Sequence, residues 1–179
     1  IDEELKMGRQ VLYMLPEIAI TTQITERLAK LFGDKLLVYH SKFSDNERVE
    51  VWNRLLHAGE PMLVLGVRSS LFLPFKDLGL IIVDEEHENT YKQQDPAPRY
   101  HARNAALVLA GMHGAKTLSG SATPSIDSCF NATTGKYGLV ELTTRYGDRL
   151  MPEILTVDIK ELRRKKIMKD TLFSPVLVE

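Results

Sequence analysis

The sequence predicts an α/β fold, in which a mostly parallel sheet carries helices on both faces. Short apolar runs alternate with amphipathic stretches, the order expected for parallel strands joined by helices. Most of the apolar runs are continuous, as in strands that are buried on both faces. The 179 residues suffice for one such core and the start of a second unit.

Six apolar runs are the predicted strands. They cover residues 11–15, 35–39, 62–65, 78–83, 116–118 and 154–157. The last run follows Pro152, after a stretch in which the pattern weakens, so we expect a domain boundary near residues 145–152.

The predicted helices have readable ends. Ser44 and Glu47 form a capping-box pattern at the start of one helix, which stops near Gly59. Trp52 lies on the apolar face of this helix, which favours core packing. Three further helices are expected after Pro16, over residues 99–112 and from residue 124 to 135.

Composition excludes several classes of protein. No apolar run approaches the roughly 20 residues of a membrane span, and the first residues lack the pattern of a signal peptide. The single cysteine, Cys129, excludes an internal disulfide and a cysteine-rich zinc site. The cytosol is therefore the expected compartment.

A net charge of −1 argues weakly against a dedicated nucleic-acid-binding domain but is compatible with a motor. The basic run at 160–169 fits a solvated helix face as well as a phosphate-binding patch.

The strand at 78–83 ends in the acidic run Asp84-Glu85-Glu86-His87. This places carboxylates at the carboxyl edge of a parallel sheet, where open α/β folds bind ligands. Phosphoryl-transfer motors use one carboxylate to hold Mg²⁺ and a second to activate water. We assign Asp84, through water, to Mg²⁺ and Glu85 to the attacking water. The alternative is a strand that ends in a solvated acidic turn.

A second polar segment, Ser121-Ala122-Thr123, follows the strand at 116–118. Alone it is an ordinary turn sequence, and its position after the acidic run in the same alternating pattern is what gives it weight. His87 is a candidate relay between a nucleotide and Ser121 or Thr123.

The polar loop between His87 and Arg99 has a length that is typical of functional loops. Tyr91 and Tyr100 offer flat faces for base stacking, while Lys92, Arg99 and Arg103 offer phosphate contacts. The competing interpretation places Tyr100 and Arg103 at the start of a helix that packs on the core.

The acidic run and the Ser121-Ala122-Thr123 segment together resemble motifs II and III of superfamily 2 helicases. The chain is more closely similar to the primosomal protein N′ (PriA) family of bacterial replication-restart helicases, and this resemblance extends over essentially the whole chain. The strings that carry it are Leu15-Pro16-Glu17-Ile18-Ala19, His40-Ser41, Gly66-Val67-Arg68-Ser69-Ser70, Glu88-Asn89-Thr90-Tyr91-Lys92-Gln93 and Arg99-Tyr100-His101-Ala102-Arg103.

The resemblance implies a RecA-like P-loop NTPase motor lobe over residues 1–147, followed at 148–179 by a linker and the beginning of a second lobe. It implies a 3′-to-5′ DNA helicase of the bacterial cytoplasm that uses ATP and Mg²⁺ in replication restart and primosome assembly. The implied partners are single-stranded and forked DNA and other primosome and replication-restart proteins, with no membrane. The family's zinc-binding cysteines are expected only outside this chain.

The resemblance also assigns roles to residues. Pro16 and Glu17 belong to a segment, 15–23, that borders the DNA path, and Arg68 and Ser69 belong to another DNA-facing segment. An arginine after a strand also pairs with an acid in many proteins, so Arg68 has a structural alternative. The loop at 91–100 resembles one that senses single-stranded DNA, and residues 121–123 couple nucleotide to motion.

Two departures qualify this picture. The string Gly-x-x-x-x-Gly-Lys-Ser/Thr, which cradles phosphates in such motors, is absent from the sequence. In the family this loop lies just upstream of the segment that resembles residues 1–8, so we expect this chain alone neither to bind ATP tightly nor to hydrolyse it. Val67 stands where the family usually has threonine.

Three alternatives remain. The first is a non-enzymatic nucleic-acid-binding or interaction module that kept the motor fold. The second is a related ATPase, such as a restriction-enzyme or RNA-helicase motor, against which the strings around Tyr91 and Tyr100 argue. The third is a metal-dependent hydrolase that uses Asp84, Glu86 and His87, although adjacent residues at a strand end point in alternate directions.

Overall fold

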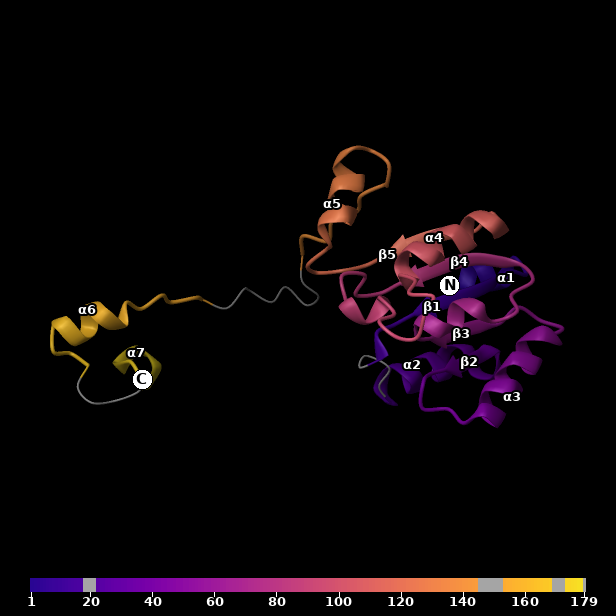
Figure 1. Cartoon of the computed structure of the whole chain (residues 1–179), viewed down its shortest axis with the longest axis horizontal. Coiled ribbons are helices and arrows are strands. Elements are labelled where there is room, and N and C mark those ends of the chain that lie inside the picture. The colour runs from indigo at the N-terminus through magenta and orange to yellow at the C-terminus, as the bar shows by residue number, and fades with distance from the viewer. Residues whose placement is uncertain (18–21, 145–152, 169–172, 179) are drawn as a thin grey trace. The chain divides into compact units, whose positions relative to one another are not determined.

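The computed structural model describes residues 1–17, 22–144, 153–168 and 173–178. Within them, five parallel strands form a sheet in the order β2-β3-β1-β4-β5 (Figure 1). The strands are β1 Gln10–Met14, β2 Leu36–Tyr39, β3 Leu63–Gly66, β4 Leu78–Val83 and β5 Lys116–Ser119. Five of the six predicted strands are thereby confirmed. The sixth prediction is wrong, because residues 154–157 have no regular structure.

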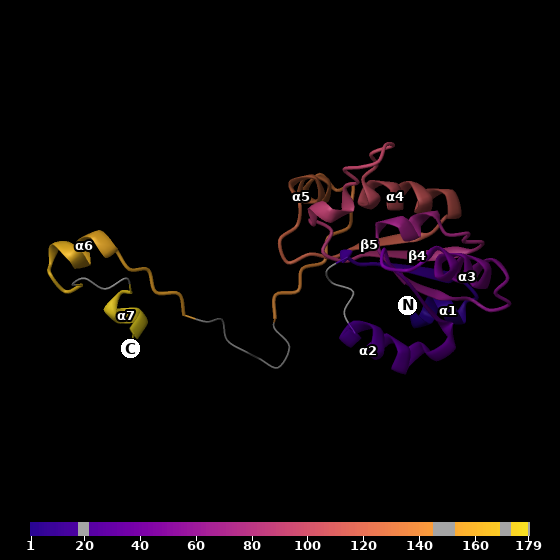
Figure 2. The ribbon, with the colours of Figure 1, turned by 60° about the horizontal axis from the view of Figure 1, so that its bottom comes forward.

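Helices cover both faces of the sheet, as predicted. The α-helices are α1 Asp2–Lys6, α2 Thr22–Phe32, α3 Asp45–Leu56, α4 Ala102–His113, α5 Ile126–Thr133, α6 Ile159–Arg164 and α7 Pro175–Val178. Short 3-10 helices are η2 Gly33–Lys35, η3 Arg68–Phe72 and η4 Asn89–Tyr91. Side chains of α3 and α4 pack into one apolar cluster with the sheet, and those of α1 and α2 pack into two others. Figure 2 shows α4 and α2 on opposite sides of the sheet.

The central strands form the core of the fold. Leu12 and Met14 of β1 and Ile81 and Val83 of β4 are fully buried, and Met14 is the register partner of Val83. Continuous apolar runs were therefore the right signal for strands that are covered on both sides. Because β1 and β4 are held rigidly side by side, the residues that follow them have fixed positions.

Helix α3 begins as predicted, but its packing differs. Ser44 donates its backbone N–H to Glu47 Oε2 over 2.7 Å, and its hydroxyl accepts from the Glu47 N–H, which completes the capping box. Leu55 is fully buried. The predicted burial of Trp52 is wrong, since 43% of this residue is exposed. Because α3 lies beside the outer strand β2, only a narrow stripe of the helix meets the core.

The chain divides into two compact units, Ile1–Gly138 and Leu139–Glu179. The boundary predicted near residues 145–152 falls outside the described residues. None of the described helices is long and apolar enough to cross a membrane.

Candidate functional site

The site residues lie where β4 and β5 end, and strand pairing continues past the ends of both. The Asp84 N–H donates to the Met14 carbonyl over 3.0 Å, and the Gly120 N–H donates to the Val83 carbonyl over 2.9 Å. The Glu86 N–H then donates to the Gly120 carbonyl over 3.0 Å. The acidic run and the segment after β5 are therefore adjacent by backbone pairing.

Asp84 is oriented by two donors. Its Oδ2 accepts from the Tyr13 hydroxyl over 2.8 Å, and its Oδ1 accepts from the Glu85 N–H over 3.0 Å. Burial, together with the Asp84 carboxylate, raises the pKa of Tyr13, so this phenol stays a donor. A carboxylate has about four acceptor positions, so Asp84 retains capacity for a water that carries Mg²⁺. Sequence reasoning missed Tyr13, because a tyrosine within a strand carries no signal of a polar partner.

Glu85 occupies a left-handed backbone conformation, with φ of 47°. This conformation costs a residue with a side chain about 1–2 kcal/mol. It turns the chain sharply after β4, so that the Glu85 side chain is 47% exposed while that of Glu86 is 2% exposed. The predicted water-activating carboxylate therefore faces solvent.

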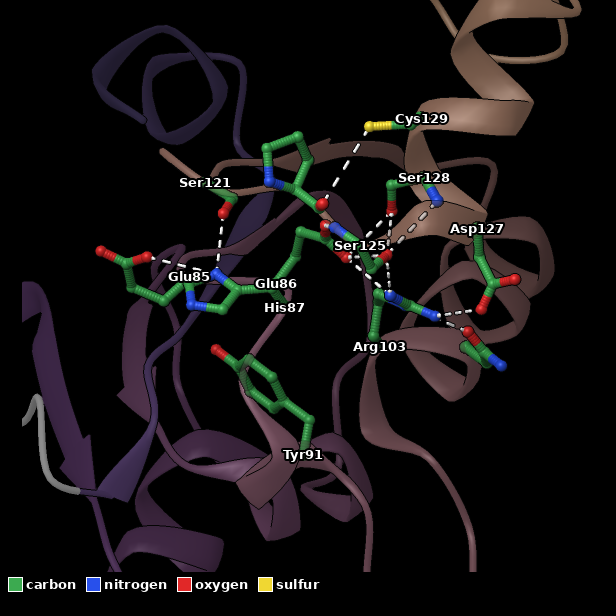
Figure 3. Close-up of polar contacts among 12 residues, drawn as sticks. Glu85, Glu86, His87, Tyr91, Arg103, Ser121, Ser125, Asp127, Ser128 and Cys129 are labelled. Atoms are coloured by element: carbon green, nitrogen blue, oxygen red, sulfur yellow. Dashed lines mark hydrogen bonds and ion pairs between the residues drawn. The ribbon is translucent and has the colours of Figure 1, made fainter.

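His87 meets the second polar segment, as predicted. Its Nδ1 lies 2.7 Å from Ser121 Oγ and 3.5 Å from Glu85 Oε2 (Figure 3). Ser121 Oγ also accepts from the Thr123 N–H over 3.0 Å, while Ala122 and Thr123 themselves are exposed. The structure thus brings Glu85, His87 and Ser121 into one chain of contacts.

Glu86 carries a buried network that sequence reasoning did not find. Its Oε1 accepts from the Ser125 N–H over 2.7 Å. Its Oε2 accepts from Arg103 Nη1 over 2.7 Å, from Ser128 Oγ over 2.9 Å and from Ser125 Oγ over 3.1 Å. Burial raises the pKa of Glu86, but these hydrogen bonds outweigh burial and hold the pKa below its ordinary value. The sequence did hold one signal for this burial: consecutive side chains at a strand end point in alternate directions, so Glu86 is expected to face inward where Glu85 faces outward.

This network excludes the metal-hydrolase alternative. Glu86 points away from Asp84 and His87 into the protein, where Arg103 and two serines saturate it. Across the described residues, no group of three or more His, Cys, Asp or Glu side chains is placed to hold a metal ion.

Two predicted DNA contacts are buried instead. The Arg103 side chain is only 10% exposed and pairs with Glu86, so the competing interpretation, a helix start packed on the core, is correct for it. Tyr91 is 1% exposed, and its hydroxyl donates to the Asp84 carbonyl at 2.7 Å, with the Met14 carbonyl at 3.1 Å. The prediction that Tyr91 stacks on a base is therefore wrong for this structure, because both faces of the ring are covered.

The remaining residues of the loop lie near the surface. Lys92 Nζ donates to the Arg99 carbonyl over 2.9 Å, which closes the loop. Arg99 is exposed, and its Nη2 lies 3.7 Å from Asp95 Oδ1. Tyr100 packs edge-on against Phe72 at 5.1 Å between ring centroids. The loop is therefore a closed, outward-facing turn.

The segment after β3 adjoins this loop. Arg68 Nη1 donates to the Thr90 carbonyl over 3.2 Å, and Tyr100 donates to the Arg68 carbonyl over 3.4 Å. Arg68 and Ser69 are half-buried. Among the residues that the structure describes, Arg68 donates to a carbonyl and not to an acid, which leaves most of its guanidinium donors available. After β1, Pro16 is buried and Glu17 is exposed. The rest of that predicted segment, residues 18–21, lies outside the described residues.

Comparison with known proteins bears on this site. The family model for DEAD/DEAH box helicase matches residues 1–131, which include all of the acidic run and residues 121–123. A solved structure, the C-terminal part of the Fun30 ATPase domain, aligns with 65% of this chain and 35% of its own chain at 12% identity, with a TM-score of 0.42.

Relatives named replication restart protein PriA match most or all of the chain. The protein of Bacillus subtilis is 40% identical over 179 residues, which is 100% of this chain and 22% of the relative. That of Haemophilus influenzae is 44% identical over 160 residues, 89% of this chain and 22% of the relative. That of Rickettsia felis is 40% identical over 179 residues, 100% of this chain and 27% of the relative. The chain thus spans about a quarter of the length of these relatives.

Proposed function

This chain belongs to the DEAD/DEAH box helicase family, and from that premise we propose that it is part of an ATP-dependent 3′-to-5′ DNA helicase that acts in replication restart and primosome assembly. The proposal extends to single-stranded and forked DNA as substrates, to other primosome and replication-restart proteins as partners, and to the bacterial cytoplasm. Its support is the similarity to the PriA relatives together with the geometry at the carboxyl edge of the sheet.

One observation carries the proposal, the contact chain from Glu85 through His87 to Ser121 beside Asp84. Family membership implies that a nucleotide is used, and Mg²⁺ neutralises the phosphates of a bound nucleotide in such motors. Asp84 would hold Mg²⁺ through water, and Glu85 would orient and activate the attacking water. Through its contact with Ser121, His87 connects this site to the coupling residues Ser121, Ala122 and Thr123.

The DNA-facing side consists of groups that remain accessible. Lys92 and Arg99 offer charge to phosphates, and Tyr100 offers a ring at the loop stem. Arg68 and Ser69 continue this surface after β3, since Arg68 and Tyr100 are in contact. Exposed Glu17 borders the path after β1, with buried Pro16 beneath it as its support. Arg103 and Tyr91 support this side from within, because both are buried.

The phosphate-binding string is absent from these 179 residues. Too little then holds the β- and γ-phosphates, so this chain alone has no DNA-stimulated ATPase activity, and turnover by the isolated chain would contradict this. Residues 1–147 form the first motor lobe, and residues 148–179 form a linker and the beginning of the second lobe.

The test is strand separation by the full-length protein. The two substrates are partial duplexes that carry either a 3′ or a 5′ single-stranded tail, and a native gel resolves each duplex from its released strand. We expect ATP-dependent unwinding of the duplex with the 3′ tail, along which 3′-to-5′ movement leads into the duplex. We expect no unwinding of the duplex with the 5′ tail. Unwinding in the opposite direction would refute the polarity alone.

The second candidate function is a non-enzymatic nucleic-acid-binding or interaction module. Native loss of the phosphate-binding string from the full-length protein would support it. A full-length protein that binds forked DNA but neither hydrolyses ATP nor separates strands would establish this alternative.

A further inference from the structure

The segment of residues 121–125, which joins β5 to α5, is held at both ends by consecutive residues of the acidic run. His87 Nδ1 contacts Ser121 Oγ at 2.7 Å at one end. At the other end, Glu86 accepts from the Ser125 N–H over 2.7 Å and from the Ser125 hydroxyl over 3.1 Å. The residues between, 122–124, are exposed.

The two ends differ in strength. The Glu86 side chain is 2% exposed and accepts four hydrogen bonds, one of them from a guanidinium. Charge-assisted bonds in a buried setting are strong, and their loss leaves an unpaired charge. The His87 side chain is 31% exposed, so water can compete for its contact with Ser121.

Arg103 secures the buried end. Its Nη1 lies 2.7 Å from Glu86 Oε2 and 2.5 Å from Ser125 Oγ, and its Nη2 lies 3.4 Å from Asp127 Oδ2. One guanidinium from α4 therefore binds both the acidic run and the start of α5 (Figure 3). With this cation in place, Glu86 remains an ionised acceptor.

We propose that Glu86 and Arg103 are positioning residues, which fix residue 125 as a pivot while the contact between His87 and Ser121 opens and closes. The anchor keeps Ser121 within reach of His87, so its loss disables coupling rather than nucleotide binding. The catalytic consequence rests on the proposed function, whereas the pivot itself rests on geometry alone.

The first arm measures amide hydrogen exchange by NMR in this chain. Glu86→Ala should speed exchange of the Ser125 N–H by about tenfold or more, and Glu86→Gln by less, because it retains one acceptor. His87→Ala should speed exchange at Thr123 and leave Ser125 within about twofold of the parent. Asp127→Asn is the matched control, since its contact is 3.4 Å long and its side chain is 82% exposed. Glu86→Gln keeps the test decisive if Glu86→Ala does not fold.

Equal exchange at residue 125 in the parent and in Glu86→Gln and Glu86→Ala would overturn the pivot. Faster exchange of the Ser125 N–H in His87→Ala than in the parent would also overturn the pivot.

The second arm measures ATP turnover by the full-length protein with and without single-stranded DNA. The ratio of the two rates is independent of the active fraction, so a merely destabilised variant leaves it unchanged. Glu86→Gln should lower this ratio by about tenfold, with the KM for ATP within about twofold of the parent. An unchanged ratio would refute the positioning role. If the parent hydrolyses no ATP, the proposed function fails, and the exchange arm still decides the pivot.

Discussion

Removal of the Tyr91 hydroxyl tests how β4 is tied to the loop that follows it. Tyr91→Phe keeps the buried ring and removes a donor that lies 2.7 Å from the Asp84 carbonyl and 3.1 Å from the Met14 carbonyl. The Met14 carbonyl still accepts from the Asp84 N–H, so it stays satisfied. Only the Asp84 carbonyl loses its donor. A buried acceptor left without a partner costs about 1–3 kcal/mol, and we expect the lower half of that range because the Asp84 carbonyl is only partly buried.

The assay is urea unfolding of the 179-residue chain, followed by circular dichroism. With a slope of about 2 kcal/mol per molar urea, a loss of about 1–2 kcal/mol lowers the midpoint by about 0.5–1 M. Tyr100→Phe is the matched control, because its hydroxyl lies 3.4 Å from the Arg68 carbonyl and is half-buried. We expect this control to change stability by less than about 0.5 kcal/mol. Equal midpoints for Tyr91→Phe and the parent would refute the reasoning.

Three further predictions concern stability. Gly66→Ala should destabilise the chain by about 1–3 kcal/mol in the same urea assay, since a Cβ there would overlap Ser70, whereas Gly59→Ala, which opens onto free space, should not. Ser44→Ala removes the side-chain cap of α3 and should cost about 1 kcal/mol, visible as a lower midpoint; no change would mean that the cap is frayed in solution. The lowered pKa of Glu86 gives stability that is present above the unfolded-state pKa of about 4.3 and is lost as pH falls through the folded-state pKa. Stability measured from pH 6 to pH 3 should therefore fall less steeply in Glu86→Gln than in the parent, and equal slopes would contradict the assignment.

The central strands could be predicted from the sequence because strands that are buried on both faces are continuous runs of apolar residues. Each residue of β3 is buried, and its run of apolar residues is continuous. The apolar run at 154–157 has the same local signal but no regular structure. A strand needs a partner, and pairing depends on residues far away in the sequence. A continuous run of apolar residues therefore identifies a candidate strand but does not show which strand it pairs with.

The site was predictable where it depended on strand ends and unpredictable where it depended on packing. Asp84 and His87 follow the largely buried strand β4, whereas Ser121 follows β5, which is mostly exposed. Neighbouring parallel strands bring their carboxyl ends together, so both segments lie at the same edge of the sheet. The burial of Tyr91 and Arg103 depends on contacts with partners 77 and 22 residues away, Met14 and Ser125. An aromatic or basic residue in a polar loop looks the same in sequence whether it faces DNA or a buried carbonyl or carboxylate.

The central claim is that the carboxyl edge of β4 is the hydrolysis edge of a DNA-stimulated motor. Its most direct test is steady-state ATP turnover by the full-length protein and its Glu85→Gln variant, with and without single-stranded DNA. Glu50→Gln, on the exposed side of α3, is the control. The predicted result is DNA-stimulated turnover that Glu85→Gln lowers by about 100-fold or more while nucleotide binding persists. Retained turnover in Glu85→Gln, with DNA stimulation intact, would contradict the role of this edge.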